Sequence, residues 1–157
     1  MHYEMRRKDR EVSRDEALAA LDKAPYGVLS SVDSDGLPYG IPLSLARDGE
    51  WLYFHCALEG HKIDNLRAAP GVCITFVGSA EFPEDHFTVV FDSAVVIGTA
   101  EEVSGDEEKI HGLRLISERF TPKNMHAFDG EIAKFLKVTG VWKIHIDEIT
   151  GKRRKQP

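Results

Sequence analysis

The chain has 157 residues, of which 42% are hydrophobic and 29% charged, and its net charge is −6. This length fits a single domain with its own core, and no apolar run is long enough to span a bilayer. The negative charge disfavours a nucleic-acid partner. Because the charged start lacks the apolar stretch of a signal peptide and the two cysteines, Cys56 and Cys73, form no disulfide framework, we expect a cytoplasmic protein with reduced thiols.

The first predicted element is a helix over residues 13–24. Ser13 and Glu16 have the spacing of a capping box, and apolar residues follow at helical spacing until Pro25 ends the pattern. From residue 27 the pattern changes to that of strands. The N-terminal helix is therefore expected to present one apolar face, formed by Ala17, Leu18, Leu21 and Ala24.

Two Asp-Gly pairs mark the turns of the next segment. Each pair stands between runs of β-forming residues, which is the strongest short-range signal for a hairpin. The sequence therefore predicts an antiparallel meander of three strands, over residues 27–32, 37–45 and 51–56.

The remaining elements alternate between strands and short helices. We predict a helix from His61 to about Ala68, a helix that begins near Ser104 or Asp106, and a loop over residues 121–129. Strands are expected at residues 71–77, 87–103 and 138–146, followed by a short basic tail over 151–157. About six mostly antiparallel strands with a few helices predict a mainly β fold, a small closed or partly closed barrel.

One candidate site is the predicted start of the helix at residue 61. Gly60 permits a tight turn, and His61 and Lys62 stand in the first helical turn, where backbone N–H groups have no partners. Such a place suits a phosphate dianion. The alternative is a plain connection with a solvated lysine, and the spacing alone does not decide between the two.

A second candidate is the strand that contains Pro42. The proline removes a donor from the ladder, and Gly40 and Ser44 leave the same flank low in bulk, so a flat ring could lie against it. The alternative is an edge strand that the proline protects from aggregation. His55 lies near the end of the next predicted strand, just before the turn at Gly60 that is the candidate phosphate site. No histidine or cysteine spacing predicts a metal site, and no GxSxG elbow predicts a hydrolase.

The same residues carry a resemblance to a known family. DGLPYGIPL at 35–43, LYFHCALEGHKIDNLR at 52–67 and FDSAVVIGTA at 91–100 resemble nitroimidazole-resistance (Nim) type proteins, as does MRRKDRE at 5–11. These proteins belong to the FMN-binding split-barrel group related to pyridoxamine 5'-phosphate oxidase. The resemblance implies one domain over residues 1–157, a six-stranded antiparallel split β-barrel that binds FMN at the interface of a homodimer.

The resemblance also implies roles for individual residues. The flavin ring would lie along Pro42, Leu43 and Ser44. The phosphate would be held by His61 and Lys62. Other cofactor-binding residues would be His55, Cys56, Ala57, Asn65 and, from the partner subunit, Ser93. The implied chemistry is electron transfer from reduced FMN to a small-molecule acceptor such as a nitro compound. Our own hypothesis is that His55 is the catalytic residue, because it would lie close enough to the ring to protonate an intermediate or to stabilise the reduced flavin.

The sequence departs from true pyridoxamine-phosphate oxidases. The strand at 40–44 has no arginine before Arg47, and Trp142 is followed by Lys143, Ile144 and His145 rather than by an arginine motif. Vitamin B6 oxidation is therefore disfavoured. Two other functions remain open at this point: a flavin-, haem- or deazaflavin-binding protein without nitro reduction, and a cofactor-free dimeric interaction module.

Overall fold

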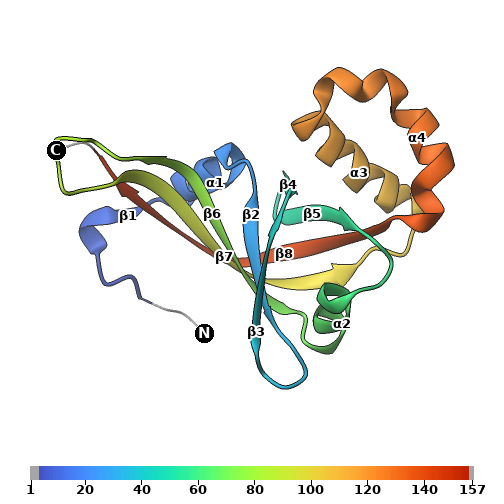
Figure 1. The fold of residues 1–157 in the computed structure, drawn as a ribbon, viewed down its shortest axis with the longest axis horizontal. Helices are drawn as coiled ribbons and strands as arrows, with labels where there is room; N and C mark the ends of the chain where they lie inside the picture. Colours follow the sequence, from blue (N-terminus) through green and yellow to red (C-terminus); the bar gives the residue numbers. More distant parts are fainter. Residues whose placement is uncertain (1–3, 156–157) are drawn as a thin grey trace.

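The computed structural model describes residues 4–155, and it is a twisted antiparallel sheet with four α-helices packed around it (Figure 1). The helices are α1 Arg14–Lys23, α2 His61–Ala68, α3 Asp106–Phe120 and α4 Phe128–Phe135, with 3-10 turns η1 Lys8–Arg10, η2 Pro122–Ala127 and η3 Leu136–Val138. The strands are β1 Glu11–Val12, β2 Gly27–Val32, β3 Pro38–Leu43, β4 Ala46–Asp48, β5 Trp51–Cys56, β6 Gly71–Glu81, β7 Val90–Glu102 and β8 Gly140–Arg154.

The strand order in the sheet is β3-β2-β6-β7-β8-β5-β4, with β1 paired to β8, and every pairing is antiparallel. The six longer strands match the predicted number, and β1 and β4 are short additions. The two edge strands, β3 and β4, follow each other in the chain but do not pair. The sheet is therefore not closed, and the predicted split-barrel fold is confirmed.

The predicted three-strand meander is wrong. β3 ends at Leu43 and pairs with β2, whereas the chain begins a new strand, β4, at Ala46 and pairs it with β5. The two hairpins thus lie at opposite edges of the sheet. The reason is the short break at Ser44 and Leu45, where the chain leaves one edge and crosses to the other, with Leu45 buried at the crossing.

The predicted N-terminal helix is confirmed as α1, which covers the inner face of the sheet. The Ser13 hydroxyl accepts from the Glu16 N–H, and the Glu16 carboxylate accepts from the Ser13 N–H, which completes the capping box. Ala17 and Leu21 are fully buried against this face. A Cβ on Gly151 would lie 2.6 Å from the Cβ of Ala17, so glycine there is what allows the helix to approach β8.

A second, smaller core lies under α3. Tyr53 and Val141 of the sheet pack against Ile116, and a Cβ on Gly112 would lie 2.7 Å from the Tyr53 ring. The segment that the sequence predicted as a loop, residues 121–129, instead forms η2 and the start of α4. Its apolar residues are stabilised by contact with α3, and Phe128 is buried there.

Several strand boundaries differ from the sequence prediction; β6, for example, continues to Glu81 instead of ending at residue 77. β8 continues to Arg154, so residues 151–154 of the predicted tail are strand, held between β7 and β1. β7 begins at Val90 rather than at Phe87, which is fully exposed. Residues 1–3 and 156–157 of the predicted domain lie outside the described residues. Within residues 4–155, no helix is both long and apolar enough to cross a bilayer.

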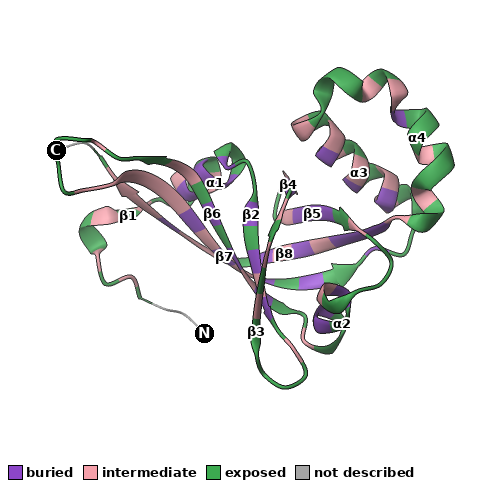
Figure 2. Cartoon of the chain, in the orientation of Figure 1, coloured by how far each residue is buried: buried purple, intermediate pink, exposed green. Residues whose placement is uncertain are grey.

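Figure 2 shows that burial concentrates in the middle of the sheet and beneath the helices. The outer face, opposite α1, has two halves. Over β4, β5 and the first part of β8 it is covered by α3. Over β2, β6 and β7 it is not, and Val28, Val77 and Tyr26 remain exposed there.

Candidate functional site

The start of α2 has the features of an anion site. Gly60 precedes the helix with a φ of 131°, a conformation that glycine adopts without strain, and no side chain caps the first turn. Lys62 has no carboxylate partner among residues 4–155; its ammonium lies 5.4 Å from the centre of the Phe54 ring. The His61 ring meets Tyr39 edge to face, with centroids 4.7 Å apart. This turn therefore leaves one cation and uncapped N–H groups available to a phosphate.

Asn65 is positioned differently from its two neighbours. It is 3% exposed, and its amide donates to the hydroxyl of Ser31 at 3.4 Å. This contact ties α2 to β2. Asn65 thus supports the helix from within, while His61 and Lys62 stand at its start.

The flank of β3 that the sequence predicted as a ring site is an open hollow of about 530 Å³. Pro42, Leu43 and Ser44 line it together with Tyr26 and Val28. Val28 pairs directly with Pro42, so both side chains point to the same outer face. Tyr26 and Val28 were missed by the sequence analysis. Counting the register back across the Asp35-Gly36 turn would have found Val28.

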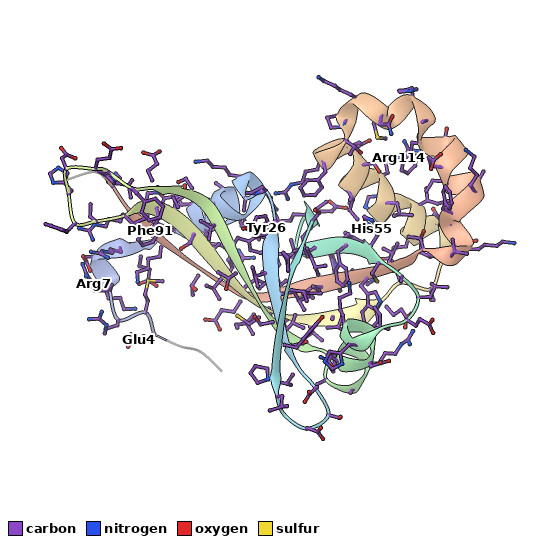
Figure 3. The ribbon with its side chains drawn as sticks, viewed as in Figure 1. Glu4, Arg7, Tyr26, His55, Phe91 and Arg114 are labelled. Carbon is purple, nitrogen blue, oxygen red and sulfur yellow. The ribbon has the colours of Figure 1, made fainter. Side chains whose placement is uncertain are left out.

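His55 lies in a different place. It lines a hollow of about 150 Å³ with Leu113, Phe128 and Phe135, beneath α3 and α4 (Figure 3). Its outer edge is exposed, but the side chains around it desolvate the ring. This burial, and then the positive charge of Lys62, lower the pKa of His55 below its ordinary value. The neutral form of the imidazole is therefore favoured at pH 7.

Cys56 ends the same strand, and Ala57 follows it directly. The Cys56 thiol turns to the opposite side from His55, against the main core, and burial raises its pKa while Lys62 opposes that shift. A Cβ on Gly140 would lie 2.8 Å from the Ala57 carbonyl oxygen, so the strand end is packed closely against β8. Both cysteines are free thiols.

Ser93 lies on β7 and donates to the Lys152 carbonyl at 3.4 Å. It lines neither the Pro42 hollow nor the His55 hollow. Within one chain, the predicted site residues therefore lie in separate places: the Pro42 hollow, the α2 start, the His55 hollow and the outer face of β7. Their joint role in a single cofactor site stays a prediction. Among residues 4–155 no group of three metal-ligating side chains occurs.

The family follows from the sequence of residues 13–153, which match the model described as pyridoxamine 5'-phosphate oxidase. The chain belongs to this family. The match runs from the cap of α1 almost to the end of β8, so the family's pattern includes the Pro42 hollow, the α2 start and His55. No curated protein matches the chain.

Several solved structures share the family's fold. A Bacteroides thetaiotaomicron protein proposed to confer 5-nitroimidazole antibiotic resistance is 24% identical, with 96% of this chain and 95% of that one covered and a TM-score of 0.74. A flavocytochrome from Azotobacter vinelandii is 22% identical, covering 99% and 74%, with a TM-score of 0.83. An FAD- and haem-binding protein from Mycobacterium smegmatis is 23% identical, covering 94% and 74%, with a TM-score of 0.77. At these identities the similarity establishes the fold.

Proposed function

We propose that the chain is an FMN-dependent oxidoreductase that reduces nitro compounds such as 5-nitroimidazoles. The observation that carries this proposal is the Pro42 hollow, which opens on the half of the outer face that α3 leaves uncovered. The uncapped start of α2, with Lys62, stands beside the other end of the same hairpin, where His61 touches Tyr39. Tyr39 and Pro42 point to opposite faces of β3, so an FMN with its phosphate at the α2 start and its ring at the Pro42 hollow would pass around this edge strand.

The residues present fit this cofactor. Lys62 and the first N–H groups of α2 would hold the phosphate, because the lysine has no internal counter-charge among the described residues. Pro42, Leu43 and Ser44 would support the ring with little side-chain bulk. A bound flavin supplies the redox chemistry itself, so the protein's part is orientation and electrostatics. The absence of the arginine motif keeps vitamin B6 oxidation disfavoured.

His55 is proposed to hold the acceptor. A hollow of about 150 Å³ lined by Leu113, Phe128 and Phe135 suits a small aromatic molecule. Because burial lowers its pKa, His55 would act at pH 7 as a neutral hydrogen-bond donor or acceptor rather than as a fixed positive charge. This refines the predicted catalytic role: protonation of the acceptor by His55 would increase as the pH falls.

We further propose a homodimer formed through the uncovered half of the outer face. Val28, Thr75 and Val95 form a continuous row across β2, β6 and β7, since each pairs with the next. Ser93 lies on the same face of β7 as Val95, two residues away. A two-fold partner would bring its Ser93 towards the other chain's site. The free thiols Cys56 and Cys73 suit a cytoplasmic location.

A second candidate is a haem or FAD protein of the same fold. The flavocytochrome and the FAD- and haem-binding protein favour it, because both superpose over nearly the whole chain. His55 and His126 are the side chains that could hold the haem iron in this alternative; burial lowers the pKa of His55, which favours the neutral ring that ligates a metal.

The deciding experiment is a visible spectrum of the purified protein, titrated separately with FMN, FAD and haem. We expect FMN to bind, to bleach on reduction and to regain its absorbance when a nitro compound is added. Lys62→Ala should weaken FMN retention by about 1.5–3 kcal/mol, because a charge-assisted contact is lost. Lys123→Ala, which removes an exposed lysine on η2, is the matched control. A Soret band with haem and an unchanged flavin spectrum would replace the proposal by the second candidate.

A further inference from the structure

A cleft of about 520 Å³ lies where the two ends of the described chain meet. Its walls are η1 and β1 on one side and residues 153–155 on the other. β1 pairs with β8 through Val12 and Gly151, so the sheet itself holds these segments together. Figure 3 places Arg7 at this end of the molecule, remote from His55. The cleft shares no lining residue with the Pro42 or His55 hollows.

The cleft is strongly polar, with five cationic side chains against three carboxylates in its wall, an excess of two positive charges. Each carboxylate is already held by a cation. The pairs are Asp9 with Arg7 (2.7 and 2.5 Å), Glu16 with Arg153 (2.6 Å) and Glu11 with Lys8 (3.3 Å).

The remaining cations are Arg10, Arg154 and Lys155. Arg10 approaches Asp9 only to 4.0 Å, and both oxygens of that carboxylate are taken by Arg7. Arg154 and Lys155 have no hydrogen-bond or ion-pair partner within residues 4–155. Three cations therefore face one cleft without a counter-ion from the described chain.

The pKa of Arg10 is consistent with an excess of positive charge in the cleft. Burial, followed by the charges of Arg7 and Arg154, lowers the pKa of the Arg10 guanidinium below its ordinary value. Like charges are thus held together in a partly desolvated place. An anion between them would relieve that repulsion.

We propose that this cleft binds a small molecule that carries a diphosphate group, of the kind found in nucleotides. Guanidinium groups bind phosphate oxygens with two parallel hydrogen bonds, and Arg10 and Arg154 come from the two opposite walls. The three unpaired cations, Arg10, Arg154 and Lys155, match a diphosphate monoester such as ADP, which carries about three negative charges at neutral pH. The volume is that of a small-molecule site rather than of one ion. This site is separate from the proposed flavin site.

The test is calorimetric titration of the full chain, loaded with FMN, with pyrophosphate, ADP and orthophosphate at fixed salt. We expect pyrophosphate and ADP to bind, and Arg10→Gln/Arg154→Gln to weaken both at least ten-fold. The double variant Lys123→Gln/Lys137→Gln removes the same charge from exposed positions elsewhere and should bind as the parent does. If Arg10→Gln/Arg154→Gln does not fold, Arg154→Gln alone replaces it in the titration. This single variant should fold, because the Arg154 side chain has no internal partner among residues 4–155.

Tighter binding of ADP than of pyrophosphate would support the proposal and show that the nucleoside contributes; equal binding would support recognition of the diphosphate alone. The proposal is overturned if orthophosphate binds as tightly as pyrophosphate, if neither diphosphate binds, or if Arg10→Gln/Arg154→Gln binds them unchanged. Loss of FMN from that variant would also overturn it, since the cleft would then belong to the flavin site. Lys62→Ala should lower FMN retention and leave pyrophosphate binding intact, which separates the two proposals.

Discussion

The two halves of the outer sheet face are built from similar alternating strands, yet one half is covered and the other is exposed. Under α3, Tyr53 and Val141 are at most 5% exposed. On β2 and β6, Val28 and Val77 are 36% and 49% exposed. Alternation along a strand shows only which residues share a face. What covers that face depends on elements that are distant in the sequence.

Polar contacts at the margin of the covered half attach α3 to the sheet. The Tyr53 hydroxyl donates to Glu108 of α3 at 3.2 Å, and Lys143 of β8 donates to the same carboxylate at 2.9 Å. Burial, followed by the hydrogen bond to Glu108, raises the pKa of Tyr53 to about 12. Within residues 4–155 no helix covers the exposed half, and this is the face proposed as the dimer interface.

Gly112→Val should give the largest change in the free energy of unfolding, because its Cβ would meet the buried Tyr53 ring at 2.7 Å. We expect a loss of about 1–3 kcal/mol from this overpacking, measured by urea denaturation. Gly130→Val is the control: it also lies in a helix, but nothing lies within 4 Å of its Cβ. Equal stability of the two variants would contradict close packing of α3.

Val28→Lys tests the exposed half. As a surface substitution it should change the free energy of unfolding of one chain by about 0.5 kcal/mol or less, yet it places a charge in the proposed dimer interface. Light scattering after gel filtration should show a dimer for the parent and a monomer for this variant. Val138→Lys, at an exposed valine of η3, should remain dimeric. A dimer that survives Val28→Lys would exclude this face as the interface.

His55→Gln should give the smallest effect, and it depends on pH. Because the pKa of His55 in the folded chain is lowered from 6.5, the unfolded chain binds more protons, and stability is lost as the pH falls from 6.5 towards the folded pKa. Between pH 7.5 and 5.5, the Tm of His55→Gln should therefore fall less than the Tm of the parent. His126→Gln, at an exposed histidine of η2, should show the same fall in Tm as the parent. If the fall in Tm were equal for the parent and both variants, the His55 ring would be solvated in the folded chain.

The sequence predicted most of the local structure correctly. The capping box at Ser13 and Glu16 fixed the start of α1, and Gly60 fixed the start of α2, because caps and turns depend on residues only a few positions apart. The motif resemblance identified the family. Residues 121–129 were wrongly predicted as a loop, because their helical structure depends on contact with α3 rather than on local spacing.

By itself, the sequence determined the approximate positions of the six longer strands, the two Asp-Gly turns, the α2 start and the family. Only the tertiary structure decided that the two hairpins lie at opposite sheet edges, that Tyr26 and Val28 join Pro42 in one hollow, and that His55 faces α3 and α4 instead. It also brought Arg10 and Arg154 together across one cleft. The physical reason is the same in each case: these arrangements depend on which distant strands pair and which faces are covered, and such contacts leave no short-range pattern in the chain.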